Sequence, residues 1–161
     1  MDELKLRDDV ERASKAFSVV IANTAKLREE AYRLRYQVYC LERGYEPGDN
    51  GIEADEFDEQ ASHVLLVHND SDTVVGTVRI VPPDLSSSRV FPMMKVCRPE
   101  LMRNLPARTT GEISRFAISK LRRMGCRETT MVRLGLMHGI LRLIPANVGS
   151  DSPVIPSHRE V

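Results

Sequence analysis

The stretch SHVLLVHNDSDTVVGTVRIV, residues 62–81, is the clearest folding signal in the chain. Two runs of apolar and β-branched residues, 62–68 and 73–81, flank the turn residues NDSD, which is typical of a β-hairpin. One arginine, Arg79, interrupts the second run. Burying an arginine is unfavourable unless a carboxylate pairs with it, so the hairpin predicts an acidic group nearby.

A strongly acidic segment precedes the hairpin. GIEADEFDE, residues 51–59, places five carboxylates in nine positions. It lacks the regular oxygen ligands and the central glycine of an EF-hand loop, so we expect no metal site. Asp55 and Asp58 are candidate partners for Arg79 and for Arg35, which lies beside an apolar helix face. Spacing alone favours a structural ion-pair network or solvated charges over a reactive site.

The elements that flank the hairpin have patterns of their own. FSVVIA, 17–22, and TGEISRFAIS, 110–119, are strand-like runs. After a cap at Asn23 or Thr24, apolar residues recur at helical steps: Leu27, Ala31, Leu34, Val38 and Leu41. A last helix is expected over 128–144, with Met131, Leu134, His138 and Leu141 on one face. This order predicts a mixed α/β fold around a largely antiparallel sheet.

Composition limits the kind of protein. The 161 residues, 42% of them hydrophobic, suit one domain, which we place at 1–144, followed by an irregular tail at 145–161. Basic and acidic residues balance at 23 each, whereas a nucleic-acid binder normally has a basic excess. No apolar run is long enough to span a membrane, and the charged start lacks the core of a signal peptide. We therefore expect a cytoplasmic protein.

Four motifs follow one another in an order that resembles a known family. YRLRYQVY, GIEADEFD, GTVRIV and GEISRF resemble the autoinducer-synthase-like branch of the GNAT acyltransferase superfamily. LRYQVYCLERGYEP, FPM, CRPEL and GEISRFAISKLRR look more specifically like acyltransferases associated with the PEP-CTERM/exosortase system, and N-acyl amino acid synthases are relatives of both. The resemblance covers about residues 17–144. It implies a GNAT fold with a site between helix, loop and sheet.

The resemblance also implies site residues. Those carried over for substrate binding are Arg35, Tyr39, Tyr45, Asp55, Asp58 and Arg79, and those for catalysis are Glu112 and Arg115. Homoserine-lactone synthases usually have phenylalanine and tryptophan where this chain has Tyr39 and Tyr45. That departure weakens the case for an S-adenosylmethionine pocket. It suits the exosortase-associated relatives better.

The implied chemistry is amide formation from a thioester and an amine. Glu112 is the candidate base for the amine proton, although a structural pairing with Arg115 is nearly as compatible with its position. Backbone N–H groups along EISRFAI are the candidate oxyanion donors. The implied acyl donor is a thioester on acyl carrier protein, with no tightly bound cofactor. RRMGCR only partly resembles the acetyltransferase pyrophosphate loop, because Arg127 replaces its last small residue, and coenzyme A is therefore a less expected donor.

Acyl carrier protein is acidic, so a docking surface should be basic. Lys120, Arg122, Arg123, Arg127 and Arg133 form a local basic segment in a chain of balanced charge. An ordinary solvated surface is the alternative explanation for the same segment.

The predicted function is N-acyl transfer from acyl carrier protein to an amino acid or related amine. The alternatives are an acyl-homoserine-lactone synthase that uses S-adenosylmethionine, and a non-catalytic remnant that binds acyl carrier protein or oligomerises. A GNAT fold continues beyond a helix such as 128–144 with further strands and a helix, which 145–161 cannot supply. We therefore expect an incomplete GNAT domain whose uncovered apolar residues favour a homo-oligomer, through the 128–144 helix or the strand at 111–118.

Overall fold

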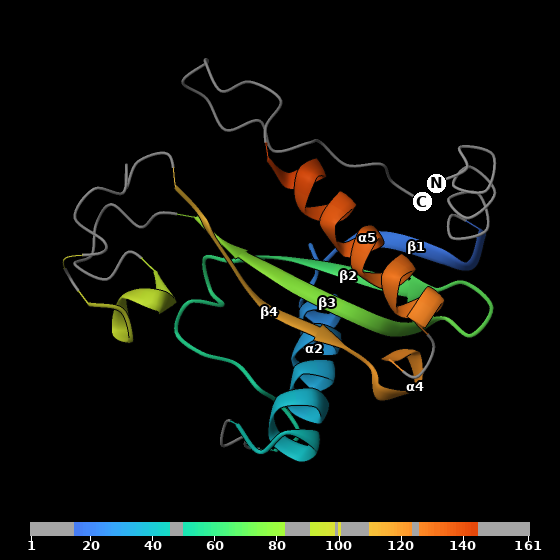
Figure 1. Ribbon diagram of the computed structural model, residues 1–161, viewed down its shortest axis with the longest axis horizontal. Helices are drawn as coiled ribbons and strands as arrows, with labels where there is room; N and C mark the ends of the chain where they lie inside the picture. The colour runs from blue at the N-terminus through green and yellow to red at the C-terminus, as the bar shows by residue number, and fades with distance from the viewer. Residues whose placement is uncertain are drawn as a thin grey trace.

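The computed structural model describes residues 15–45, 50–82, 91–98, 100, 110–123 and 126–144, and their side chains except at 121, 123 and 126–128. The described strands are β1 (Phe17–Ile21), β2 (Ser62–His68), β3 (Thr73–Val81) and β4 (Glu112–Ile118). The helices are α2 (Ala25–Arg35), the π-helix η1 (Tyr36–Glu42), the 3₁₀ helix η2 (Pro92–Lys95), α4 (Lys120–Arg123) and α5 (Cys126–Leu143). The sheet lies between α2 on one face and α5 on the other (Figure 1).

The strands form one sheet in the order β1-β2-β3-β4, and each neighbouring pair is antiparallel. The predicted hairpin is confirmed, because β2 and β3 occupy 62–68 and 73–81. The expected mixed α/β fold around an antiparallel sheet is confirmed with it. The register of the β3–β4 pair shifts between Thr77 and Arg79. That irregularity is important for the site, because it lies beside the buried arginine of β3.

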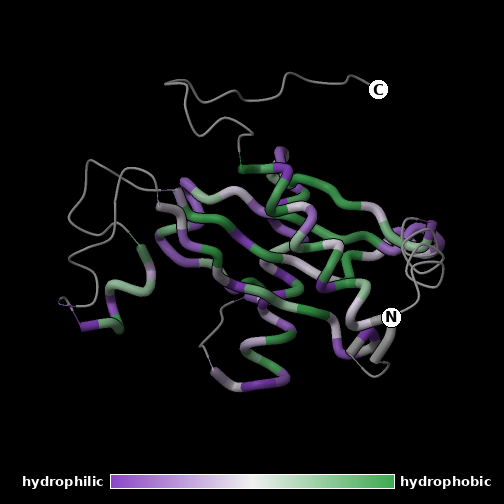
Figure 2. The backbone as a smooth tube through the Cα atoms, turned by 45° about the horizontal axis from the view of Figure 1, so that its top comes forward, coloured by the Kyte–Doolittle hydropathy of each residue, from purple (hydrophilic) through white to green (hydrophobic). Residues whose placement is uncertain are grey.

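Helix α5 packs on the sheet through Val132, Leu136 and Ile140, which are buried in the largest hydrophobic cluster. Two glycines, Gly135 and Gly139, lie where the helix approaches β2 most closely. The colouring of Figure 2 shows that α5 and the central strands are largely hydrophobic, whereas α2 alternates between hydrophobic and hydrophilic residues. The main core therefore lies between α5 and the sheet.

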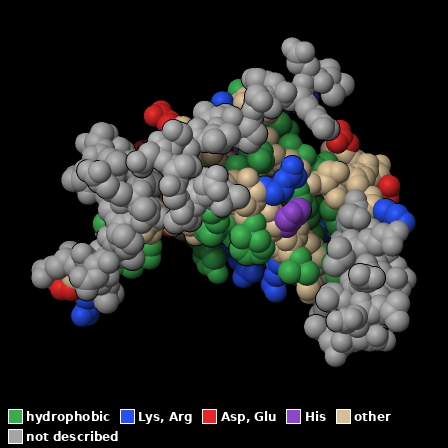
Figure 3. All heavy atoms as spheres, turned by 90° about the horizontal axis from the view of Figure 1, so that it is seen from above, with side chains coloured by type: hydrophobic (Ala, Val, Ile, Leu, Met, Phe, Trp, Pro, Cys, Tyr) green, Lys and Arg blue, Asp and Glu red, His purple; other side chains and the backbone are tan. Residues whose placement is uncertain are grey.

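The helical spacing in the sequence indicated another apolar face of α5, which points away from the sheet. Leu134 and Leu141 are 52% and 67% exposed, and Met137 is 40% exposed. Figure 3, seen from above, shows hydrophobic side chains reaching the surface on this side of the molecule. Within the described residues, the outer face of α5 thus lacks cover, as the sequence led us to expect. The spacing did not identify Val132, Leu136 and Ile140, which form the face that packs on the sheet.

Helix α2 begins as predicted but does not continue as a regular α-helix. Thr24 is the cap, and its Oγ1 accepts a hydrogen bond from the Leu27 N–H at 3.2 Å. Beyond Arg35 the chain forms a π-helix, whose wider turns change which residues share a face. Val38 stays buried, but Leu41, which regular helical spacing would place on the same apolar face, is 67% exposed.

No described helix is long and apolar enough to cross a membrane. Residues 1–14 and 145–161 lie outside the described part of the chain, so the irregular tail expected at 145–161 is not among the observations.

Candidate active site

The acidic segment folds into a turn that orients its own carboxylates. The backbone N–H of Asp55 donates to Asp58 Oδ2 at 2.8 Å, and that of Phe57 donates to Asp55 Oδ1 at 3.0 Å. The Phe57 ring is only 3% exposed and anchors the turn to the protein. Hydrogen bonds within the turn itself therefore orient Asp55 and Asp58.

Arg35, at the end of α2, is completely buried against this turn. Its Nη1 and Nη2 donate to the two carboxylate oxygens of Asp58 at 2.8 and 2.9 Å, which is the bidentate arrangement that a guanidinium favours. Its Nε donates to Glu53 Oε2 at 2.5 Å. Every face of this guanidinium thus meets a carboxylate of the acidic segment.

Arg79 reaches the same carboxylates from the sheet. Its Nη1 lies 2.6 Å from Asp55 Oδ1 and 2.7 Å from Asp58 Oδ1, and its Nη2 donates to Asp55 Oδ2 at 3.0 Å. Its Nε donates to the hydroxyl of Ser114 on β4 at 3.1 Å. The arginine in the middle of an apolar strand therefore has the acidic partners that its burial required.

Arg115 enters the group through the irregularity in β4. Arg79 pairs with Ser114 and Thr77 pairs with Ala117, so two residues of β4 lie opposite one residue of β3, which is a β-bulge. Arg115 takes up a positive φ of 53° there. Its Nε donates to Glu53 Oε1 at 2.9 Å and its Nη2 to Asp55 Oδ2 at 3.1 Å.

Tyr39 of η1 supports the bulge from the other side. Its hydroxyl donates to the backbone carbonyl of Phe116 at 2.8 Å, and the Arg115 guanidinium lies over its ring at 5.9 Å. Burial raises the pKa of Tyr39, so its hydroxyl stays protonated and remains a donor at neutral pH. The π-helix thereby fixes the conformation of β4 next to Arg115.

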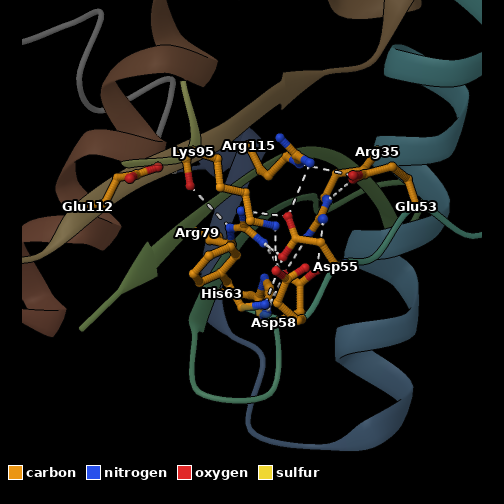
Figure 4. Close-up of polar contacts among 12 residues, drawn as sticks. Arg35, Glu53, Asp55, Asp58, His63, Arg79, Lys95, Glu112 and Arg115 are labelled. Carbon is orange, nitrogen blue, oxygen red and sulfur yellow. Dashed lines mark hydrogen bonds and ion pairs between the residues drawn. The ribbon is translucent and has the colours of Figure 1, made fainter. Parts of the chain in front are cut away.

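These side chains form an arginine–carboxylate cluster of Arg35, Glu53, Asp55, Asp58, Arg79 and Arg115 (Figure 4). Burial alone would raise the pKa of Asp58, but the hydrogen bonds from Arg35 outweigh it and lower the pKa to about 2. The pKa of Asp55 is lowered in the same way, with the Arg79 hydrogen bonds overcoming its burial. Neither aspartate is a proton acceptor near neutral pH.

Residues 34–133, more than half of the chain, match the acetyltransferase (GNAT) domain family. The chain belongs to the GNAT acetyltransferase family. This confirms the GNAT fold and the acyltransferase family expected from the sequence motifs.

Two solved structures resemble this chain in fold. The crystal structure of the AHL synthase LasI shares 26% sequence identity over 78% of this chain and 64% of its own, with a TM-score of 0.53. A CoA-dependent acyl-homoserine lactone synthase, BjaI, solved with SAM and isopentyl-CoA, shares 24% identity over 79% of this chain and 62% of its own, with a TM-score of 0.55. The chain therefore spans less than two thirds of the length of each synthase.

The structure of this GNAT chain brings together most of the residues that the motifs indicated. Arg35, Asp55, Asp58, Arg79 and Arg115 meet in the cluster, and Tyr39 borders it. The motifs did not single out Glu53, although it joins two of the arginines. The sequence could have indicated Glu53, because it lies two residues before Asp55 in the same acidic segment. Composition alone does not distinguish it from Glu56, which is exposed and pairs with Lys95.

Glu112 lies apart from the cluster (Figure 4). Its Oε2 accepts a hydrogen bond from the backbone N–H of Met93 in η2 at 2.8 Å. The ion pairs described for Arg115 are those with Glu53 and Asp55, and the expected pairing of Glu112 with Arg115 is not among them. Its role as a base remains a prediction.

The other predicted residues lie further out. Tyr45, three residues beyond the end of η1, is 67% exposed. Lys120 is exposed, and the guanidinium of Arg122 lies 6.0 Å from the Phe17 ring centre. The side chains of Arg123 and Arg127 are outside the described part. No group of three or more metal-ligating side chains occurs among the described residues.

Only one edge of the cluster reaches solvent. The side chains of Arg35, Glu53, Asp58 and Arg79 are at most 5% exposed, whereas Asp55 is 20% and Arg115 is 24% exposed. A carboxylate and a guanidinium therefore lie side by side at the surface, next to the bulge of β4. The buried members hold that pair in place and are unsuited to proton transfer themselves.

His63 of β2 lies next to the cluster (Figure 4). It is 1% exposed, its ring meets the Tyr32 ring edge-on at 5.3 Å, and its Nε2 lies 3.6 Å from Asp58 Oδ1. Burial lowers the pKa of His63 to about 4, with Asp58 opposing the effect. The ring is thus neutral at physiological pH.

The His63 pKa predicts a loss of stability in mild acid. The unfolded chain binds a proton on this residue near the ordinary pKa of 6.5, whereas the folded chain does so only near 4, so stability falls as the pH drops from 6.5 to 4. Between pH 7.5 and 5.5 we expect a loss of about 1 kcal/mol through His63. Asp58 contributes at lower pH, because its stabilisation is lost as the pH falls from 3.8 toward about 2.

Urea unfolding at pH 7.5 and 5.5 measures this change. His63→Gln should remove that part of the pH dependence, and the control His138→Gln, at an exposed position on α5, should retain it. Equal pH dependence in His63→Gln and the unmodified chain would contradict the prediction.

Proposed function

We propose that this GNAT chain transfers a fatty acyl group from a thioester on acyl carrier protein to the amine of an amino acid or related molecule. The observation that carries the proposal is the paired Arg115 and Asp55 at the surface edge of the cluster. A guanidinium recognises a carboxylate, and a carboxylate recognises an ammonium group. The pair therefore matches the two charged groups of an amino acid, next to the strand edge where an acyl group would lie.

The proposed reaction forms a C–N bond and breaks a C–S bond. The amine nitrogen attacks the thioester carbonyl, and the carrier thiol leaves as the tetrahedral intermediate collapses to an amide. Glu112 is the proposed base, which takes the amine proton directly or through a water and returns it to the leaving thiol. Backbone N–H groups at the β4 bulge are the proposed donors to the oxyanion, because a bulge redirects main-chain groups out of the regular ladder.

A second function has one observation in its favour. The chain resembles LasI in fold at 26% identity, and BjaI was solved with SAM and isopentyl-CoA. An acyl-homoserine-lactone synthase, with either thioester as donor, is therefore the runner-up. We rank it second because Tyr39 and Tyr45 differ from the residues usual in such synthases, and because the Tyr39 hydroxyl here is used to bind β4.

The assay that separates these functions offers two donors, acyl carrier protein and coenzyme A thioesters, to a panel of amino acids and to S-adenosylmethionine. Released thiol measures turnover, and mass spectrometry identifies the product. An N-acyl amino acid supports the proposal, whereas a homoserine lactone would replace it with the second function. Binding of the acyl carrier protein without turnover on any acceptor would favour a non-catalytic chain.

Two substitutions should change this activity differently. Arg115→Met should raise the KM for the acceptor roughly 10- to 100-fold, because a charge-assisted hydrogen bond contributes about 1.5–3 kcal/mol. Glu112→Gln should lower kcat roughly 100-fold with little change in KM, because it removes the proposed base. Arg33→Met, an exposed arginine paired with Glu29, is the control and should leave both constants unchanged. Full activity in Glu112→Gln would exclude Glu112 as the base.

The carrier is proposed to dock on the basic segment around Lys120, Arg122 and Arg123. Lys120 and Arg133 are exposed, so their charges can be reversed without breaking a described contact. The double variant Lys120→Glu, Arg133→Glu should weaken binding of acyl carrier protein roughly 10-fold, and raising the salt concentration should weaken it further. Arg142→Glu, near the end of α5, is the control. Binding that is indifferent to both salt and charge reversal would remove this docking site.

A homo-oligomer also remains a proposal. Its support is the apolar face of α5 that is exposed in the described part of the chain, formed by Leu134, Met137, Leu141 and the neighbouring Ile144. Sedimentation velocity over a range of concentrations is the measurement that decides it.

A further inference from the structure

His63 is a buried titratable group for which the proposed reaction has no use. It lies on β2 directly opposite Arg79 of β3. Neither of its ring nitrogens has a hydrogen-bond partner within the described structure, and its Nε2 is 3.6 Å from Asp58 Oδ1. A buried ring without partners is unfavourable, so its position next to a shared carboxylate calls for a physical explanation.

The titratable groups around His63 come from three elements. Helix α2 contributes Arg35 and Tyr32, whose ring contacts the histidine, the acidic turn contributes Asp58, and β3 contributes Arg79. Strand β1, which pairs with β2 on its other side, has the sequence FSVVI and contributes no titratable side chain. The nearest carboxylate is thus already shared by two arginines.

The cluster is electrically neutral while the His63 ring is neutral, because three guanidinium groups face three carboxylates. Protonating His63 would add a fourth cation, buried like Arg35 and Arg79. Uncompensated buried charge is strongly unfavourable, so the cluster would be expected to lose the cation that reaches water most easily. Arg35 and Arg79 are completely buried, whereas Arg115 is 24% exposed.

We propose that the protonation of His63 and the release of Arg115 from Glu53 and Asp55 are coupled. With a neutral His63 ring, Asp58 remains with Arg35 and Arg79, and Asp55 and Glu53 hold Arg115 at the bulge. With a protonated ring, Asp58 is drawn toward His63 and Arg115 turns to solvent. His63 is in this sense a positioning residue for Arg115, and the coupling holds whether or not the proposed reaction is correct.

The coupling has to act in both directions, because linkage between two equilibria is reciprocal. Removing the charge of Arg115 leaves the cluster with an excess negative charge, which favours a proton on His63. The pKa of His63 should therefore rise in Arg115→Gln. A charge removed elsewhere on the surface should have no such effect, since solvent screens it.

NMR titration of the histidine Cε1–H signals tests this directly. In Arg115→Gln we expect the His63 midpoint to rise by roughly 0.5–1 unit. In Arg115→Lys, which keeps the charge, and in Arg33→Gln, it should stay within error of the unmodified chain. The signals of His68 and His138 in the same spectra are internal references. An unchanged His63 midpoint in a folded Arg115→Gln would overturn the proposal.

A second measurement is made on the unmodified chain. The Nε–H signal of Arg115, assigned by its loss in Arg115→Lys, should shift in the unmodified chain with the same midpoint as His63. If the Arg115 signal stays constant while His63 titrates, the two events are independent and the proposal fails.

Discussion

Replacing Arg79 by methionine is expected to lower the free energy of unfolding by about 3–5 kcal/mol, the cost of removing one partner from a buried ion pair. Arg79 is completely buried and donates to both Asp55 and Asp58. Methionine fills much of the same space but donates no hydrogen bond. Two carboxylates would then share the remaining arginines, with less positive charge to offset their burial.

Urea unfolding at pH 7.5, where both carboxylates are ionised, gives the measurement. The matched control is Arg33→Met on α2, an exposed arginine whose ion pair with Glu29 should contribute under about 1 kcal/mol. If Arg79→Met were as mild as Arg33→Met, the cluster would not hold the acidic turn against the sheet. The difference between the two variants therefore measures burial, since the chemical change is the same.

A second result follows from the same geometry. Because Arg79 positions Asp55, which in turn holds Arg115, a folded Arg79 variant should also lose order at the surface pair. Loss of activity in Arg79→Met would therefore not identify Arg79 as a catalytic residue. Arg115, which reaches the surface, is the position where binding and stability can be separated.

The sequence predicted this site to the extent that charge compensation required it. An arginine in an apolar strand needs a carboxylate partner. The acidic segment just before the hairpin is rich in carboxylates. Which of its five carboxylates turn inward was not predictable from composition. That choice depends on Phe57, whose burial fixes the turn and directs Glu53, Asp55 and Asp58 to the arginines while Glu56 faces out.

Two features of the site have no simple signal in the sequence. The π-helix at Tyr36–Glu42 arises within a stretch whose apolar spacing fits a regular helix, and it is this change of winding that exposes Leu41. The β-bulge at Arg115 lies within a run that is otherwise typical of a strand. Both depend on contacts between distant segments, such as the Tyr39 hydroxyl bound to the Phe116 carbonyl, and those contacts form only in the folded chain.

The face of α5 that packs on the sheet was not identified from the sequence, for a different reason. This helix carries apolar residues on both sides, so periodicity alone cannot choose between Val132, Leu136 and Ile140 and the outer residues. Glycine gives the better signal. A glycine lowers helix propensity by about 1 kcal/mol relative to alanine, so two of them on one side of a helix indicate a close approach to another element. Gly135 and Gly139 mark the side that faces the sheet.

Replacing Gly139 by valine should therefore lower the free energy of unfolding by about 3 kcal/mol or slightly more, at the upper end of the range for overpacked cores. A Cβ atom at this position would lie 2.3 Å from Val64 Cγ1 and 2.9 Å from Val19 Cγ1, closer than real atoms approach. Both neighbours are β-branched side chains with few rotamers, so neither can move aside easily. Helix α5 would have to lift from the sheet, which would expose part of the main core.

Thermal and urea unfolding of Gly139→Val, of one control variant and of a double-mutant cycle tests this account. Leu141→Val places the same β-branched residue on the exposed side of α5, so it measures helix propensity alone and should cost under about 1 kcal/mol. Gly139→Ala combined with Val64→Ala should be less destabilising than the sum of the two single changes, because the smaller residue on β2 makes room for the new methyl group. Strict additivity in that pair would show that the close approach of Gly139 to Val64 does not limit the packing of α5, and that the glycine serves some other purpose in the helix.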